Sequence, residues 1–154
     1  MKSGLQRAAL VAYLFLSVYL LAQTTPEKVL TITQTLDKTG ATTEPKVFSV
    51  ALGKALKIEP DTIQLALEKH GQKPSALACA QLIATKKNEP FEEVLPKCRK
   101  EFDPINTLTE SRIPLDDALD YLLSVEAQVS SALSGSHDRN NPSKPNSSMV
   151  SLGQ

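Results

Sequence analysis

Between Val47 and Leu133, apolar side chains recur every three or four positions, which is the spacing of one face of an α-helix. Prolines and acidic residues stand at the starts of these apolar segments, and glycine, asparagine or proline follows most of them. Proline is favoured in the first turn of a helix, and glycine is favoured just after the last turn. The pattern predicts an all-α fold: a small bundle of about five short helices, of which the last is the longest.

The predicted helices cover residues 47–58, 60–71, 74–88, 90–100 and 114–133. The fourth contains Pro96, which should kink or end it because proline lacks the backbone N–H that a helix interior needs. Residues 103–114 contain two prolines and are expected to form a connector between the fourth and fifth helices.

Residues 23–46 are rich in threonine and poor in large apolar side chains. Thr24 and Glu27 have the spacing of a capping box, and Val29, Ile32 and Leu36 would share one helical face. Threonine also favours strands, but a single strand has no second strand to pair with in this chain. We therefore expect a short helix or a linker ahead of the helical domain, which is placed at residues 47–133.

The last predicted helix has apolar residues at the three-and-four spacing of a coiled coil. Such a stripe needs a surface to pack against, either within the chain or on a partner protein. The residues predicted to bind a protein partner are Leu115, Leu119, Leu122, Leu123 and Val129.

The two ends of the chain differ in character from the middle. Lys2 and Arg7 precede the uncharged apolar run from Ala8 to Ala22, which is shorter than the roughly 20 residues of a membrane-spanning helix. Residues 1–22 are therefore predicted to be a signal sequence of a secreted or periplasmic protein. Because Leu20 fits the cleavage site poorly, an uncleaved anchor is the alternative. Residues 134–154 are polar and lack any apolar period, which predicts a disordered tail.

Cys79 and Cys98 are the only cysteines. If Asn88 lies at the turn of an antiparallel helix pair, the two cysteines lie at nearly equal distances from that turn and face each other. An exported protein meets an oxidising compartment, so the sequence predicts a disulfide between them. Two buried free thiols are the alternative, and Pro96 is the residue that would turn Cys98 away.

Charge argues against nucleic acid as a partner. Lysine plus arginine and aspartate plus glutamate each total 17 in the chain. Between Val47 and Leu133 there are 10 basic and 13 acidic residues, a net charge of −3, whereas a DNA-binding domain presents a basic face.

No group of residues has the composition and spacing that a catalytic, metal or cofactor site needs. His70 lies nine residues before Cys79, but the break from Gly71 to Pro74 separates a thiol nucleophile from this possible base. His137, the other histidine, lies in the predicted tail, and no glycine-rich phosphate loop is present. The acidic residues that open the last helix are expected to complement its dipole.

These observations favour a non-enzymatic, exported helical protein that binds an unidentified protein partner, with no cofactor and no metal. The alternative is a membrane-anchored accessory subunit that contacts the membrane only through residues 1–22. An enzyme that uses Cys79 is a further alternative.

Overall fold

The computed structural model describes residues 24–98 and 102–137. All the regular elements in these two ranges are helices, which confirms the predicted all-α class, and α8 is the longest. They are α2 (Thr25–Thr42), α3 (Pro45–Leu56), α4 (Pro60–Glu68), α5 (Pro74–Lys87), α6 (Phe91–Val94), the 3-10 helix η1 (Leu95–Cys98), α7 (Pro104–Glu110) and α8 (Leu115–His137). The predicted signal sequence and the part of the predicted tail after His137 lie outside the described residues.

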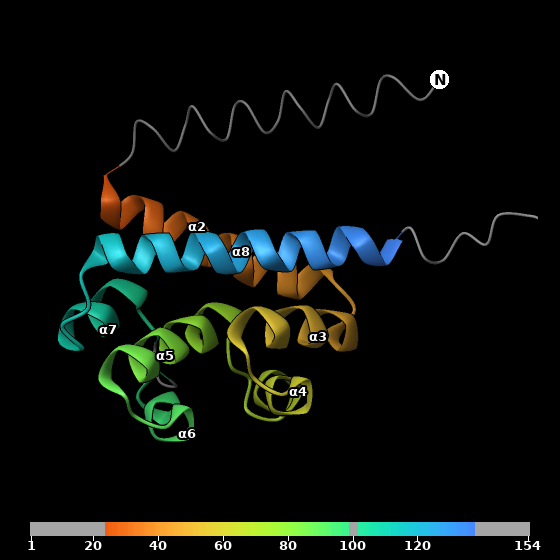
Figure 1. The fold of residues 1–154 in the computed structure, drawn as a ribbon, viewed down its shortest axis with the longest axis horizontal. Coiled ribbons are helices and arrows are strands. Elements are labelled where there is room, and N and C mark those ends of the chain that lie inside the picture. Colours follow the sequence, from red (N-terminus) through yellow and green to blue (C-terminus); the bar gives the residue numbers. More distant parts are fainter. Residues whose placement is uncertain (1–23, 99–101, 138–154) are drawn as a thin grey trace, which may run out of the picture.

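The helices form three tiers (Figure 1). The helices α2 and α8 lie side by side in the first tier, and α3 and α5 pack beneath them in the second. The short helices α4 and α6 follow α3 and α5 respectively and form the third tier, while α7 lies near the start of α8. One continuous hydrophobic core joins the tiers, and its largest fully buried side chains include Phe48, Leu36, Leu52, Leu77 and Leu122.

The threonine-rich segment forms an 18-residue helix rather than a linker. Threonine is tolerated there because its hydroxyl can donate to the carbonyl one turn earlier. The hydroxyl of Thr35 donates to the carbonyl oxygen of Thr31 at 2.9 Å, and the hydroxyl of Thr39 donates to that of Thr35 at the same distance. Val29 and Leu36, on the adjoining side of the helix, are fully buried. The helical domain therefore begins near Thr24 and not at Val47.

A hydrogen bond fixes the direction of α2 relative to α8. The hydroxyl of Thr25 donates to Oδ1 of Asp116 at 2.9 Å, although the two residues are 91 positions apart. Both lie in the first turns of their helices, so α2 and α8 start together and run in the same direction. Asp117 pairs with Lys86 of α5 at 2.8 Å, which links α8 to the second tier as well.

The predicted connector contains a further helix, α7. Asp103 caps it, because its Oδ1 accepts hydrogen bonds from the backbone N–H groups of Ile105 and Asn106 at 2.9 and 3.1 Å. Pro104 occupies the first turn, where a missing N–H costs nothing. The prolines of this segment start helices instead of breaking one, and Leu108 anchors α7 in the core.

The fourth and the last predicted helices differ most from their predicted ends. The segment that contains Pro96 is a four-residue α-helix followed by a 3-10 turn, so proline ends the α-helix as expected. The last helix continues to His137, four residues beyond its predicted end at Leu133.

Candidate functional site

The predicted partner-binding residues of α8 mostly belong to the core. Leu122 and Val129 are 0% and 1% exposed, so a partner cannot reach them in the folded chain. Leu115 and Leu119 are half-buried and pack against the same core. Only Leu123 is substantially exposed, at 37%. The coiled-coil-like stripe is therefore used inside the chain, against α2, α3 and α5.

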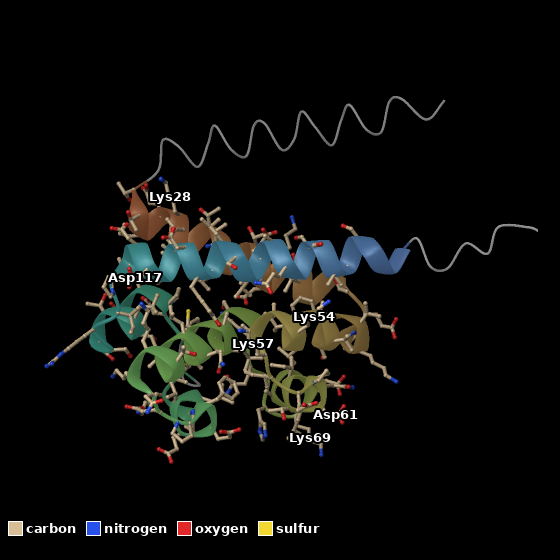
Figure 2. The ribbon with its side chains drawn as sticks, in the orientation of Figure 1. Lys28, Lys54, Lys57, Asp61, Lys69 and Asp117 are labelled. Carbon is tan, nitrogen blue, oxygen red and sulfur yellow. The ribbon has the colours of Figure 1, made fainter. Side chains whose placement is uncertain are left out.

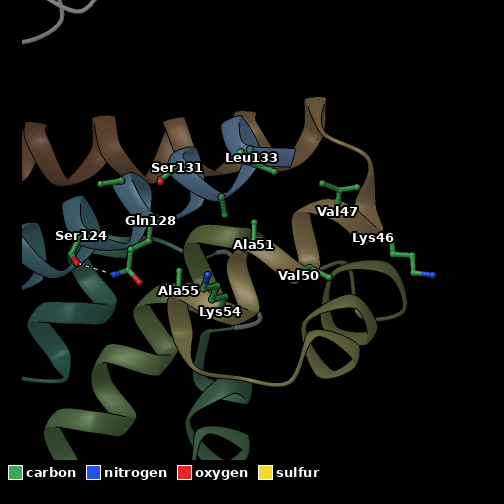
Figure 3. Close-up of a pocket in the computed structure, with 13 residues that line it drawn as sticks. Lys46, Val47, Val50, Ala51, Lys54, Ala55, Ser124, Gln128, Ser131 and Leu133 are labelled. Atoms are coloured by element: carbon green, nitrogen blue, oxygen red, sulfur yellow. Dashed lines mark hydrogen bonds between the residues drawn. The ribbon is translucent and has the colours of Figure 1, made fainter. Parts of the chain in front are cut away.

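A different face of α8 borders an open hollow. The hollow is an open groove of about 960 Å³ between α3 and the C-terminal half of α8 (Figure 3). Lysine, valine and alanine side chains come from α3, and α8 contributes small or polar residues together with Leu133. The lining residues are Lys46, Val47, Val50, Ala51, Lys54, Ala55, Ser124, Ala127, Gln128, Ser131, Ala132, Leu133 and Gly135.

The wall on α3 is the side of that helix that the core does not fully cover. Pro45 starts α3, and the lining residues recur along it at spacings of three and four. Ala51 is buried at the base of this wall, whereas Val50 is 52% exposed, the highest exposure of any large apolar side chain in the described part of the chain. The α3 wall therefore offers water an apolar surface that the protein itself does not bury.

The wall on α8 is built from small side chains. Ser124, Ala127, Ser131 and Gly135 follow one another at intervals of three or four residues, on a different side of α8 from the buried stripe. Nε2 of Gln128 donates to Oγ of Ser124 at 3.1 Å, which holds the longest polar side chain of this wall along the helix. Small side chains let another chain approach a helix closely, as at helix interfaces generally.

The electrostatic character of the groove is simple. Among the described residues that line it, Lys46 and Lys54 are the only ionisable ones. Neither forms an ion pair with any residue that the structure describes. The part of the groove that the structure describes thus combines an apolar floor with two positive charges and no carboxylate.

None of the residues that line the groove is among those predicted from the sequence to bind a partner. The signal in the sequence is a second periodic row of alanine, serine and glycine on α8, on a different side of the helix from the row of leucine and valine. A row of small residues is common on exposed helix faces, so its meaning depends on which helix lies next to it.

The predicted disulfide is wrong. Cys79 and Cys98 are free thiols, and both are buried. The prediction assumed two regular antiparallel helices, but the chain after Asn88 forms only one α-helical turn and then the 3-10 turn around Pro96. Because the backbone changes direction there, Cys98 does not lie opposite Cys79 as it would on a second regular helix running back from Asn88.

The surroundings of Cys79 favour the neutral thiol. Burial raises its pKa far above the ordinary value, and nearby Cys98 and Asp37 raise it further through charge repulsion. Burial also raises the pKa of Cys98 to about 11. A nucleophilic cysteine needs an accessible thiolate, usually beside a positive group. His70 is exposed in the loop after α4, whereas the Cys79 side chain is fully buried in α5.

Within residues 24–98 and 102–137, no group of three or more histidine, cysteine, aspartate or glutamate side chains is arranged to hold a metal ion. Asp103 caps α7, while Asp116 and Asp117 connect α8 to neighbouring helices. None of the helices in these ranges is both long enough and apolar enough to cross a bilayer.

Comparison with known proteins adds no assignment. No protein-family model matches the chain, and neither the curated proteins nor the solved structures contain a significant match. The groove between α3 and α8 is therefore the feature on which a functional interpretation rests.

Proposed function

We propose that this protein is a non-enzymatic binding module that holds an apolar segment of a partner protein in the groove between α3 and α8. The observation that carries the proposal is the combination of a hollow of about 960 Å³ with the 52% exposure of Val50 at its edge. A volume of this size is in the range of ligand and peptide sites, and burying an exposed valine on binding is favourable.

We further propose that the module acts outside the cytoplasm. The support is the run from Ala8 to Ala22 behind two basic residues, which has the composition of a secretory signal. Intact mass of the protein isolated from its natural host tests this point. Loss of the first 22 residues is expected, and a full-length mass would instead favour the membrane-anchored alternative.

Site-specific photocrosslinking tests the groove. A photoreactive amino acid is introduced at Val50 and, in a separate variant, at Leu65, which is 44% exposed on α4 and does not line the groove. In cells of the producing organism, position 50 is expected to give a discrete adduct with one protein, and position 65 is expected to give none.

The adduct must then be tied to binding. The partner identified at position 50 is purified and titrated with the wild-type protein, Val50→Asp and Leu65→Asp. We expect Val50→Asp to weaken binding at least tenfold, because it places a charge in the apolar contact, and Leu65→Asp to leave it unchanged. Equal adducts from both positions, or equal affinities of both variants, would rule out the groove as the binding site.

A further inference from the structure

We infer that the occupant of the groove is an amphipathic helix of a partner protein that carries acidic side chains beside its apolar face. This inference rests on the proposed function and deepens it by naming the chemistry of the partner. It is carried by the charge of the lining, in which two lysines and no carboxylate border an apolar floor.

The shape of the groove favours a helix as the occupant. Its two walls are two helices that present rows of side chains at spacings of three and four, and a third helix packs into the furrow between such rows. The α8 wall extends from Ser124 to Gly135, which corresponds to roughly 16 Å at about 1.5 Å per residue. A helix of about three turns covers that length.

The floor sets the apolar side of the occupant. Ala51, Ala55 and Ala132 are small, so they leave room that larger side chains from the partner can fill. Leucine or isoleucine on the occupant would bury Val50 together with this floor. An occupant made of small residues would leave the hollow partly empty and lose the contacts that make burial favourable.

The lysines set the polar side of the occupant. Lys46 lies at one end of the groove beside Val47, and Lys54 lies nearer its middle (Figure 3). They are separated by two turns of α3, or about 12 Å. Carboxylates seven or eight residues apart on the occupant would match this separation. Because neither lysine has an ion pair within the described residues, both can meet a carboxylate without breaking an existing contact.

Three synthetic helical peptides of equal length and identical leucine and alanine face form the test. Two flanking positions, seven residues apart, carry glutamate, glutamine or lysine. Each peptide is titrated by fluorescence anisotropy against the full chain, against Lys46→Glu combined with Lys54→Glu, and against a control with Lys69→Glu and Lys87→Glu. The control residues are exposed and do not line the groove, and Lys69 lies at the far side of α4 (Figure 2).

At low salt, the glutamate peptide is expected to bind the wild-type chain five- to tenfold more tightly than the glutamine peptide, since two exposed ion pairs contribute modestly. The lysine peptide is expected to bind most weakly. The order should invert on the variant with both groove lysines reversed and persist on the control variant. Salt at 0.5 M should reduce the preference, because it screens exposed charges.

Equal Kd values for the three peptides would overturn the acidic partner and leave the proposed function intact. A glutamate preference that survives reversal of Lys46 and Lys54 would overturn it too, because the charge would then be recognised elsewhere. Absence of peptide binding, combined with binding of a fatty acid that Val50→Asp abolishes, would overturn both proposals and assign the groove to an aliphatic carboxylate.

Discussion

The carboxylate of Asp37 in α2 accepts two hydrogen bonds from Ser75 at the start of α5, one from the backbone N–H and one from the hydroxyl, each 2.9 Å long. The first turn of a helix has N–H groups without partners inside the helix, and here a neighbouring helix supplies one. Ser75 is only 1% exposed, so water cannot take the place of Asp37.

Asp37→Ala is therefore expected to lower the free energy of unfolding by about 1–3 kcal/mol, the cost of leaving buried polar groups without partners. Urea denaturation of the purified protein measures the change. Asp120→Ala is the control, because Asp120 is exposed on α8 and forms no hydrogen bond with the described residues. A loss of equal size in both variants would show that the Asp37 contact contributes nothing specific.

Adjacent leucines of α8 provide a second test. Leu122 is fully buried, whereas Leu123 is 37% exposed. Leu122→Ala should destabilise the fold by about 2–5 kcal/mol, and Leu123→Ala should cost less than about 1 kcal/mol. Thermal unfolding of the two variants distinguishes a core stripe from a docking stripe. Similar, small losses for both would mean that Leu122 is not buried in the chain and would restore it as a partner-binding residue.

Gly53 lies in the last turn of α3, beside the loop that leads to α4. A Cβ atom there would lie 2.7 Å from the carbonyl oxygen of Ile58 and 3.3 Å from Cα of Pro60. Gly53→Ala should therefore destabilise the protein by about 1–3 kcal/mol, although alanine is the better helix former. In Gly135→Ala, the new methyl group meets nothing within 4 Å, and the change should be neutral or stabilising by up to about 1 kcal/mol. Equal stability of the two variants in urea would contradict the close approach at Gly53.

The buried thiols predict a distinct labelling pattern. Cys79 and Cys98 should resist an alkylating reagent at pH 8 in the native protein and react fully in urea without any reductant. Intact mass after labelling gives the number of modified thiols. If labelling in urea required prior reduction, the two cysteines would be joined in solution.

The raised pKa values also predict loss of stability at alkaline pH. Burial raises the pKa of Cys98 from the ordinary 9.0 to about 11, so between these values the folded chain binds more protons than the unfolded chain. The contribution of the Cys98 thiol to the free energy of unfolding is complete below pH 9 and is lost as the pH rises toward 11. Cys98 alone accounts for at most about 2 kcal/mol by pH 10.5.

Urea midpoints at pH 8 and pH 10.5 measure this loss. Cys98→Ala should reduce the difference between the two midpoints, because it removes one of the titrating thiols. Two other groups would account for the remaining difference: Cys79, whose pKa burial also raises, and Tyr121, whose pKa burial raises to about 12. If the urea midpoint of Cys98→Ala falls between pH 8 and pH 10.5 by as much as that of the wild-type protein, burial does not raise the pKa of Cys98.

The sequence by itself determined the five helices α3, α4, α5, α6 and α8 and most of their starts, whereas α7 lies in a predicted connector. Helix starts and stops depend on nearby residues: Pro60 and Pro74 begin helices, and Asn88 ends one in the left-handed conformation with φ of 55°. The buried stripe of α8 could also be identified, since apolar periodicity reports which side of a helix avoids water. These are local properties, and residues within one or two turns specify them.

Only the tertiary structure decided which surface that stripe covers and which surface stays open. Leu122 and Val129 have the same sequence signature whether they face a partner or the core, and the position of α2, α3 and α5 settles that they face the core. The groove exists because α3 and α8 lie side by side, a relation between segments about 80 residues apart. Cys98 departs from its predicted place because one 3-10 turn redirects the backbone, and periodicity does not encode that change of path.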